Sequence, residues 1–426
     1  MGEDVLDLAQ YNSVYGLNSE GNGYPVLRMN EFDMLFAGNP TQYSDKFSQE
    51  DFLVHSLKKD DVLICRTNGN PNLVGKSALV ARNYEHVYES HLFKVRPKKE
   101  LITSATLVTY LNTSYGRLEI NKLSMQGNQA NFSIAKFKEL KLPKFSVELN
   151  HQIDKNVFNA FDFLEQSKLK YAQAEQTLLE AVGLADFKPS TQNTNIKTFA
   201  QSFGASGRLD AEYYQPKYEV FESTVKSNKN GFTLVKNEYD HFNSVSRKPK
   251  AAYHYIEISD VNVSDGTNSP IFIETSELPA NAKFEVIKGD LIISKVRPNR
   301  GAITVIESEL DNLIVSGAFT VLREKPSSVF TKEVLKVLLR TPVYREWMLQ
   351  FNVGTQYPVI RDEDILDLPI PKIDLATQTN ISQLVQQSFS LKAQSEHLLS
   401  VAKHAVEMAI EQDEAAAMHF IENSTN

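Results

Sequence analysis

The sequence repeats itself at a nearly constant offset, and this duplication constrains the fold more than any other feature. Four blocks of the first half recur in the same order in the second half, shifted by 226 to 231 residues. The matched blocks are 24–32 with 255–263, 57–80 with 286–306, 91–98 with 317–324, and 107–145 with 334–373. Because chance similarity would not keep one register across four blocks, the pattern predicts a duplicated domain.

Each half ends in a long segment whose apolar spacing predicts an amphipathic helix. Residues 146–184 contain no proline, and residues 374–412 repeat the same spacing. The apolar positions of the first segment are Ile153, Val157, Phe161, Leu164, Leu178 and Val182. At 1.5 Å per residue each helix would reach about 50 Å. We expect the two helices to pair, since each covers the apolar stripe that the other exposes.

The segments before these helices alternate between strand-like runs and short helical patterns. The predicted fold class is therefore α+β, with two pseudo-repeated mixed α/β domains separated by two long helices that pair as an antiparallel coiled coil. The predicted boundaries are 1–147 for the first mixed domain, 148–187 for the central helix, 188–206 for a polar linker, 207–373 for the second mixed domain, and 374–426 for the C-terminal helix.

Composition restricts the class of protein without identifying it. No run of apolar residues is long enough to span a bilayer, and the acidic N-terminus lacks the apolar core of a secretory signal, so a cytoplasmic location is expected. Cys65 is the only cysteine, which excludes an internal disulfide. The formal net charge of −8 opposes nucleic-acid binding on average. Local clusters of cations decide such binding, however.

The order of these features resembles the specificity subunits of type I restriction-modification systems. The resemblance covers nearly the whole chain and is carried by 289–306, 207–219, the closing pattern 354–378, and its first-half copy 127–152. A departure is that the segment 208–222, which leads into the second domain, has no counterpart before the first. That difference puts the packing of the N-terminal region in doubt.

The resemblance implies a function in DNA recognition. Each mixed domain would be a target-recognition domain that reads one half of a bipartite double-stranded DNA target, and the helices would set the gap between the halves. The helices would also bind two DNA adenine methyltransferase subunits, and restriction (motor) subunits would join this core. By the same resemblance the chain is non-catalytic and holds no cofactor, while S-adenosylmethionine and ATP are expected on the partner subunits.

Two equivalent loops carry the side chains suited to DNA contact. The loop 66–76 contains three asparagines and two glycines between cations, and its equivalent is 295–301. Arginine suits the major-groove edge of guanine, asparagine suits adenine, and lysine suits phosphate. A solvated hairpin turn has a similar composition, so both interpretations stay open. The candidate residues are Arg66, Asn68, Asn70, Lys76, Lys295, Arg297, Asn299 and Arg300.

Further candidates lie outside these loops. Arg247 and Lys248 begin a basic cluster that precedes two tyrosines, which are either neighbours of a phosphate grip or core residues of the next strand. Gln129 and Gln356 are equivalents in the repeat, and Tyr357 follows the second of them. Either glutamine suits adenine or a turn hydrogen bond. A further basic run, 94–99, is interpreted as an ordinary polar strand face.

Motifs for catalysis are missing from the sequence. It contains no phosphate-binding Gly-x-x-x-x-Gly-Lys-Ser/Thr loop, no Gly-x-Ser-x-Gly elbow and no Asn/Asp-Pro-Pro-aromatic motif of base-flipping methyltransferases. The histidines lack the spacing of a zinc site. Besides the specificity subunit of a restriction-modification complex, three alternatives stay open. They are a specificity subunit of a methylation-only or other phage-defence complex, an enzyme that carries its own DNA-recognition domain, and a duplicated scaffold that binds only proteins.

Overall fold

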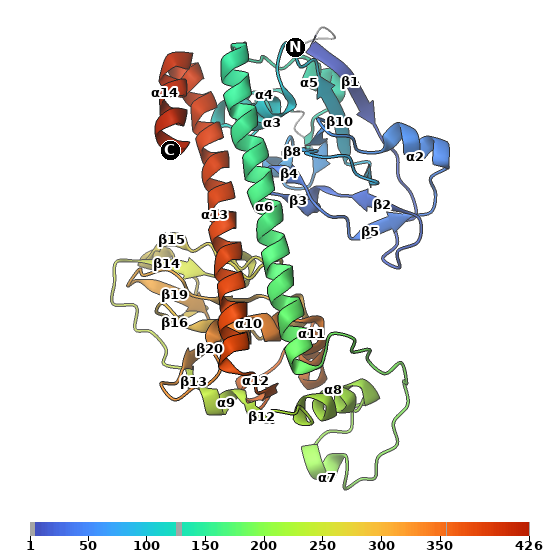
Figure 1. Ribbon diagram of the computed structural model, residues 1–426, viewed down its shortest axis with the longest axis vertical. Coiled ribbons are helices and arrows are strands. Elements are labelled where there is room, and N and C mark those ends of the chain that lie inside the picture. The colour runs from blue at the N-terminus through green and yellow to red at the C-terminus, as the bar shows by residue number, and fades with distance from the viewer. Residues whose placement is uncertain (1–4, 125–129, 355, 426) are drawn as a thin grey trace. The chain divides into compact units, whose positions relative to one another are not determined.

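The structure, a computed structural model, describes residues 5–124, 130–354 and 356–425 (Figure 1). The chain forms two compact units. Unit 1 comprises Met1–Ser167 and Phe389–Asn426, and unit 2 comprises Lys168–Ser388. Two long helices, α6 (Val147–Val182) and α13 (Leu375–Glu411), each contribute residues to both units. In the described part of the chain, no helix is both long and apolar enough to cross a membrane.

Unit 1 is built on two main sheets. The six-stranded sheet has the order β1 (Leu6–Tyr11), β10 (Leu92–Pro97), β6 (Val62–Cys65), β8 (Ser77–Leu79), β4 (Phe36–Ala37) and β3 (Phe32–Asp33). The three-stranded sheet has the order β5 (Gln42–Ser44), β2 (Tyr24–Leu27) and β9 (Val87–Tyr88). A short pair joins β11 (Ala130–Asn131) to β7 (Thr67–Asn68).

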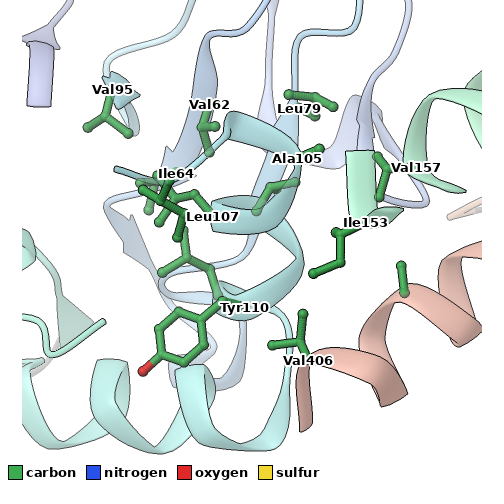
Figure 2. Close-up of a cluster of buried hydrophobic side chains, with 14 of the residues drawn as sticks. Val62, Ile64, Leu79, Val95, Ala105, Leu107, Tyr110, Ile153, Val157 and Val406 are labelled. Atoms are coloured by element: carbon green, nitrogen blue, oxygen red, sulfur yellow. The ribbon is translucent and has the colours of Figure 1, made fainter. Parts of the chain in front are cut away.

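Strand β6 lies between two apolar layers, which explains why all four of its residues are apolar and buried. Val62 and Ile64 face a core that also holds residues of α3 and α6, as Figure 2 shows. Leu63 and Cys65 point to the opposite side, into a cluster with residues of the three-stranded sheet. Alternation along the strand sends successive side chains to opposite faces. Cys65 is free and fully buried, and this burial raises the pKa of its thiol to about 11.

The short helices of unit 1 begin where a side chain can cap them. They are α2 (Gln49–His55), α3 (Ser104–Leu111), α4 (Ser114–Leu123) and α5 (Ile134–Lys138), with single 3-10 turns η1 (Met29–Glu31) and η2 (Pro71–Leu73). The hydroxyl groups of Thr103 and Thr113 accept hydrogen bonds from backbone N–H groups in the first turns of α3 and α4. Such caps satisfy donors that have no partner within the helix.

The end of the chain differs from the expected single helix over 374–426. Helix α13 stops at Glu411, and a separate helix, α14 (Glu414–Thr425), follows. Asp413 accepts a hydrogen bond from the backbone N–H of Ala416 at 2.8 Å, which starts the new helix. The ring of Phe420 lies 6.3 Å from that of His404, so α14 runs back beside α13. Helix α6 occupies nearly the whole of the expected 146–184 segment.

In unit 1, the first part of α6 packs against the second part of α13. Ile153 and Val157 of α6 share one core with Ala402 and Val406 of α13. The hydroxyl of Ser395 donates to the backbone carbonyl of Ala160 at 2.7 Å. The apolar positions predicted from the spacing of the α6 sequence are all buried.

Unit 2 also has two main sheets. One has the order β13 (Tyr239–Phe242), β20 (Phe319–Glu324), β17 (Leu291–Ser294) and β18 (Ile303–Val305). The other has the order β15 (Ile271–Glu274), β14 (Ala252–Ile256), β19 (Leu313–Ser316) and β16 (Ala282–Glu285). A short pair joins β12 (Phe232–Leu234) to β21 (Pro369–Pro371).

The helices of unit 2 are mostly short. They are α7 (Phe203–Ser206), α8 (Pro216–Lys226), α9 (Val235–Glu238), α10 (Lys332–Arg340), α11 (Pro342–Trp347) and α12 (Asp362–Leu366), with the 3-10 turns η3 (Ile258–Asp260), η4 (Thr275–Glu277), η5 (Pro298–Arg300) and η6 (Met348–Phe351). The hydroxyl of Thr341 caps α11 as that of Thr113 caps α4. Helix α10 forms where the sequence pattern predicts one and ends just before Thr341-Pro342.

The two units share strand order and strand direction. The order β1-β10-β6-β8 of unit 1 corresponds to β13-β20-β17-β18 of unit 2, and all of these neighbours are antiparallel. Strand β2 pairs antiparallel with β5 and parallel with β9, as β14 does with β15 and β19. The first pair of repeated blocks, 24–32 and 255–263, forms a strand only at its start. In each unit the strand, β2 or β14, is followed by a 3-10 turn, η1 or η3.

Candidate nucleic-acid interface

The two candidate loops leave equivalent strands and are held at their starts by the same backbone hydrogen bonds. In unit 1 the N–H of Arg66 donates to the carbonyl of His91 at 2.7 Å, and its carbonyl accepts from Phe132 at 2.8 Å. In unit 2 the N–H of Lys295 donates to Ala318 at 2.9 Å, and its carbonyl accepts from Ile360 at 3.0 Å. These bonds place Arg66 and Lys295 at the same position of two similar frames.

A buried ion pair fixes the strand that leads into each loop. The guanidinium of Arg96 donates to Asp61 at 3.0 Å, and that of Arg323 donates to both carboxylate oxygens of Asp290 at 2.8 Å. Both aspartates also accept from backbone N–H groups three residues earlier. The hydrogen bonds to Asp290 raise the pKa of Arg323. The matching anchors place both loops at the ends of firmly held strands.

The basic run 94–99 is not the ordinary polar face that its sequence suggests. Lys94 is 2% exposed, because residues packed on that face of the sheet cover its ammonium, which lies 5.6 Å from the ring centroid of Tyr88 and donates to the carbonyl of Ser56 at 2.9 Å. Burial lowers the pKa of Lys94, and the nearby carboxylate of Asp61 opposes this effect. The run therefore contributes to the anchor beneath the loop in unit 1.

The loop of unit 1 is folded by its own asparagines. The side-chain oxygen of Asn68 accepts from the N–H of Asn70 at 2.8 Å, and that of Asn70 accepts from Asn72 at 3.0 Å. The guanidinium of Arg66 lies over the ring of Tyr11, 4.9 Å from its centroid, and the side chain of Lys76 is half-buried. Thr67, Asn68 and Gly69 line a hollow of about 210 Å³ together with Met29 and Asn30 of η1, Glu89 and His91.

The loop of unit 2 places Arg297 in an unusual backbone conformation. Its φ of 50° is in the left-handed region, which a residue with a side chain seldom adopts. The conformation is held because the N–H of Arg297 donates to the carbonyl of Pro358 at 2.7 Å. Its exposed guanidinium lies 5.2 Å from the ring centroid of Tyr357, an arrangement that favours a cation. Arg297 and Tyr357 are thus in contact with each other on the surface.

A second hollow adjoins this pair. It has a volume of about 380 Å³ and is lined by Arg297, Arg300 and Tyr357, by Ile258 and Ser259 of η3, and by the apolar side chains Val261, Val263, Val296 and Ala302. The turns η1 and η3, which follow the equivalent strands β2 and β14, therefore line a hollow beside the loop in each unit. Sequence reasoning missed these turns as site residues, although both lie in the first repeated block.

Lys295 does not present a free ammonium to a phosphate. Its Nζ lies 3.0 Å from one carboxylate oxygen of Asp362, at the start of α12, and 3.1 Å from the other. The same carboxylate accepts from the hydroxyl of Thr320 at 2.6 Å. DNA contact by Lys295 stays a prediction, and in this structure its ammonium is paired with the carboxylate of Asp362.

The remaining candidates are dispersed. Arg247 is exposed, and Lys248 is half-buried with a φ of 53°, while the tyrosines that follow, Tyr253 and Tyr255, are buried on β14. The interpretation of Tyr253 and Tyr255 as core residues of the strand is therefore confirmed. The side-chain oxygen of Asn299 is buried without a hydrogen-bond partner among the described residues. The structure brings together Arg297, Arg300 and Tyr357, whereas Arg247 and Lys248 lie on the segment before β14.

The two glutamines fall at the closing segments of the loops. Gln356 is exposed next to Tyr357, whereas Gln129 lies outside the described residues. The sequence repeat aligns Gln129 with Gln356. The backbone hydrogen bonds make Phe132 the equivalent of Ile360, which lies one residue further along than that alignment predicts. The segments that close the two loops thus differ by one residue in length.

Two curated proteins with detectable sequence similarity are specificity subunits of type I restriction enzymes. No known protein-family profile matches the chain. It is 28% identical over 200 residues to the specificity subunit of the type I restriction enzyme HindI from Haemophilus influenzae, covering 40% of this chain and 43% of that protein. It is 22% identical over 249 residues to the specificity subunit of the type I restriction enzyme EcoKI from Escherichia coli, covering 56% of this chain and 47% of that protein. The chain spans about half the length of the curated relatives it matches.

Two solved structures cover nearly the whole chain at low identity. The type I restriction-modification S subunit from M. genitalium covers 95% of this chain and 92% of its own, with 11% identity and a TM-score of 0.43. The HsdS subunit from Thermoanaerobacter tengcongensis covers 96% of this chain and 95% of its own, with 13% identity and a TM-score of 0.31. The chain is therefore similar, over part of its length, to the specificity subunits of type I restriction enzymes.

Proposed function

We propose that this chain is the DNA-recognition subunit of a type I restriction-modification complex and that each unit reads one half of a bipartite target. Each unit has the same frame of strands, with a polar loop at the same place and a hollow beside it. This duplicated loop and hollow is the observation that carries the proposal. In unit 1 the loop presents asparagines and in unit 2 it presents arginines, so the two half-targets differ in sequence.

The proposal extends to the spacing of the half-targets and to the partners. Helices α6 and α13 each belong to both units, and as an antiparallel coiled coil they would set the number of unread bases. Two DNA adenine methyltransferase subunits and the restriction subunits are the proposed partners. Catalysis, S-adenosylmethionine and ATP belong to those partners in this proposal. The supporting observation is that the repeated features of this chain are frames and loops rather than known catalytic motifs.

Selection from a randomised duplex library tests the proposal. Purified full-length chain is incubated with the library alone, and again after co-expression with the methyltransferase of its own genome, and the retained duplexes are sequenced. Two short conserved blocks separated by a constant unspecified gap are expected. Retention of no sequence motif in either preparation would contradict the proposal and favour a scaffold that binds only proteins.

Arg297 provides the sharpest residue-level test. Its fixed backbone and the stack on Tyr357 hold the guanidinium before DNA arrives, which suits bidentate bonding to guanine. We expect Arg297→Ala to cost about 1–3 kcal/mol at one guanine of one half-target, measured by competition between matched and mismatched duplexes.

Lys288→Ala is the matched control for Arg297→Ala. It removes one exposed cation of the same unit, which pairs with Glu309 away from the loop. The control should leave base preference unchanged. An equal loss of affinity of Arg297→Ala for every sequence would mean that Arg297 contacts phosphate instead of a base.

A further inference from the structure

An arginine lies at the same place in the helix beneath each loop. Arg117 of α4 comes four residues after the capping Thr113, and Arg345 of α11 comes four residues after the capping Thr341. The N–H of each arginine donates to the carbonyl of that threonine at 3.0 Å. The two side chains therefore leave equivalent helical turns.

Arg117 bridges two carbonyls of the loop in unit 1. Its Nη2 donates to the carbonyl of Asn72 at 2.9 Å and to that of Val74 at 2.8 Å. Gly75 follows with a φ of 76°, and a Cβ at this position would lie 3.2 Å from Nη1 of Arg117. Burial of the guanidinium lowers the pKa of Arg117. The hydrogen bonds fix the second half of the loop to the first turn of α4.

Arg345 makes the corresponding contact in unit 2. Its Nε donates to the carbonyl of Asn299 at 2.6 Å, and its Cδ lies 3.2 Å from the position of a Cβ on Gly301. Gly301 also has a φ of 76°. Each loop therefore ends in a left-handed glycine beside the arginine, and the arginine binds a carbonyl two or three residues before that glycine.

A loop that discriminates bases must hold its side chains to within about half an ångström, and supporting hydrogen bonds supply that precision. Within each loop, the residues just before the glycine form a single 3-10 turn, η2 or η5, which is short and weakly bonded by itself. A guanidinium is suited to the task, because its planar fork offers several donors and keeps its charge. In each unit one guanidinium nitrogen makes the contacts, Nη2 of Arg117 or Nε of Arg345, and the rigid plane holds that nitrogen in place, whereas a lysine ammonium lies at the end of a flexible chain.

We propose that Arg117 and Arg345 are positioning residues, each of which sets the conformation of one loop and thereby the base selectivity of one half-target. The inference rests on the proposed function, since it concerns the same loops. Neither arginine is assigned a contact with DNA. Loss of the arginine would let the loop adopt several conformations, so that correct and incorrect bases are bound with more similar affinity.

The randomised duplex selection described above, applied to Arg117→Met and Arg345→Met, tests this inference. Each variant is expected to lower selectivity by about tenfold at positions within one half of the target and to leave the other half unchanged. The affected halves should be opposite for the two variants. Exposed lysines of the same units supply the matched charge-loss controls, Lys122→Met and Lys372→Met, which should preserve both halves.

The conservative variants Arg117→Lys and Arg345→Lys separate positioning from charge. We expect them to keep the melting temperature close to that of the parent and yet to lose selectivity in the same half as the methionine variants. Full selectivity in the lysine variants would overturn the proposal, because charge alone would then suffice. Equal loss in both halves would overturn it too, because the effect would not be local to one loop.

The design distinguishes this inference from the proposed function. If the parent chain selects a bipartite motif and the arginine variants select the same motif with equal stringency, the positioning role is wrong and the proposed function stands. If the parent selects no motif, the proposed function itself fails.

Discussion

The loops of the two units share an anchoring frame but differ in length and chemistry. From Arg66 to Lys76 the first loop is three residues longer than its equivalent from Lys295 to Ala302. The first is folded by asparagine side chains, whereas the second holds an exposed arginine in a left-handed conformation. The comparison teaches that backbone bonds at the loop ends keep the frame constant while the side chains between them vary.

The helices beneath the loops differ as well. Asn112, just before the capping threonine of α4, binds Ser77 of β8 through its side-chain amide. At the same position before α11 stands Arg340, which is 8% exposed and donates to Gly301, Val263 and the hydroxyl of Tyr171 on α6. In unit 2 the residue at this position, Arg340, therefore connects the loop to helix α6. In unit 1 the residue at this position, Asn112, binds strand β8 instead.

The prediction with the largest expected effect tests this difference between Arg340 and Asn112. Arg340→Ala leaves the buried carbonyl of Gly301, the carbonyl of Val263 and the hydroxyl of Tyr171 without their charged donor, and it is expected to lower the free energy of unfolding by about 3 kcal/mol. Asn112→Ala removes neutral hydrogen bonds and is expected to cost about 1 kcal/mol. Denaturant titration measures both, and the single tryptophan, Trp347, reports on unit 2 by its fluorescence. An equal cost of the two substitutions would contradict the distinction.

The next prediction concerns Lys336, a buried lysine of α10 whose equivalent position in unit 1 is not a lysine. Burial, with a further contribution from the charge of Arg340, lowers the pKa of Lys336 to about 7, whereas the equivalent residue of α3 is Val108. Below pH 7 the lysine is protonated in both folded and unfolded chains, and the folded chain bears the full cost. Between that pKa and the ordinary one, the unfolded chain binds more protons, so stability rises with pH.

Lys336→Val removes this dependence by installing the residue of unit 1. We expect the melting temperature to rise most at about pH 6 and the gain to shrink towards about pH 10. Calorimetry across this range gives the measurement, with Lys332→Val as control, because this half-buried lysine of α10 pairs with Glu333 at 3.4 Å. A gain that stays constant with pH would show that packing rather than protonation is responsible.

The last prediction concerns the two left-handed glycines, Gly75 and Gly301. Gly75→Ala should cost about 2 kcal/mol, because the new Cβ would lie 2.5 Å from the buried side chain of Ile120 in addition to the unfavourable φ. Gly301→Ala should cost about 1 kcal/mol, because its neighbour is the flexible side chain of Arg345 at 3.2 Å. Denaturant titration ranks the pair, and the reverse order would show that the two loops are packed differently from this description.

The sequence predicted the elements whose signals are local or repeated. The apolar spacing from Ile153 to Val182 marks the buried face of α6, and the constant offset pairs the strands that lead into the loops. The interruption of the last helix at Asp413 was missed, because a single capping aspartate in an otherwise helical sequence gives a weak signal.

Side-chain partners could not be predicted, because they depend on contacts between distant segments. Lys295 resembles a free cation in sequence, and only the fold brings Asp362 to it. Lys94 resembles a surface residue, and only the strand order places it inside. The arginines beneath the loops did leave a signal, since each follows a threonine by four residues in both copies, but nothing local indicates what they bind.

The bonds that fix Arg66 and Lys295 at the loop entrances involve main-chain atoms alone. Main-chain atoms are the same in every residue type except proline, so mutation of these entrance side chains leaves the attachment intact. A gene for such a protein is therefore free to explore new loop sequences in one unit without disturbing the other. Under the proposed function, recognition of a new half-target would then arise from changes confined to a few codons.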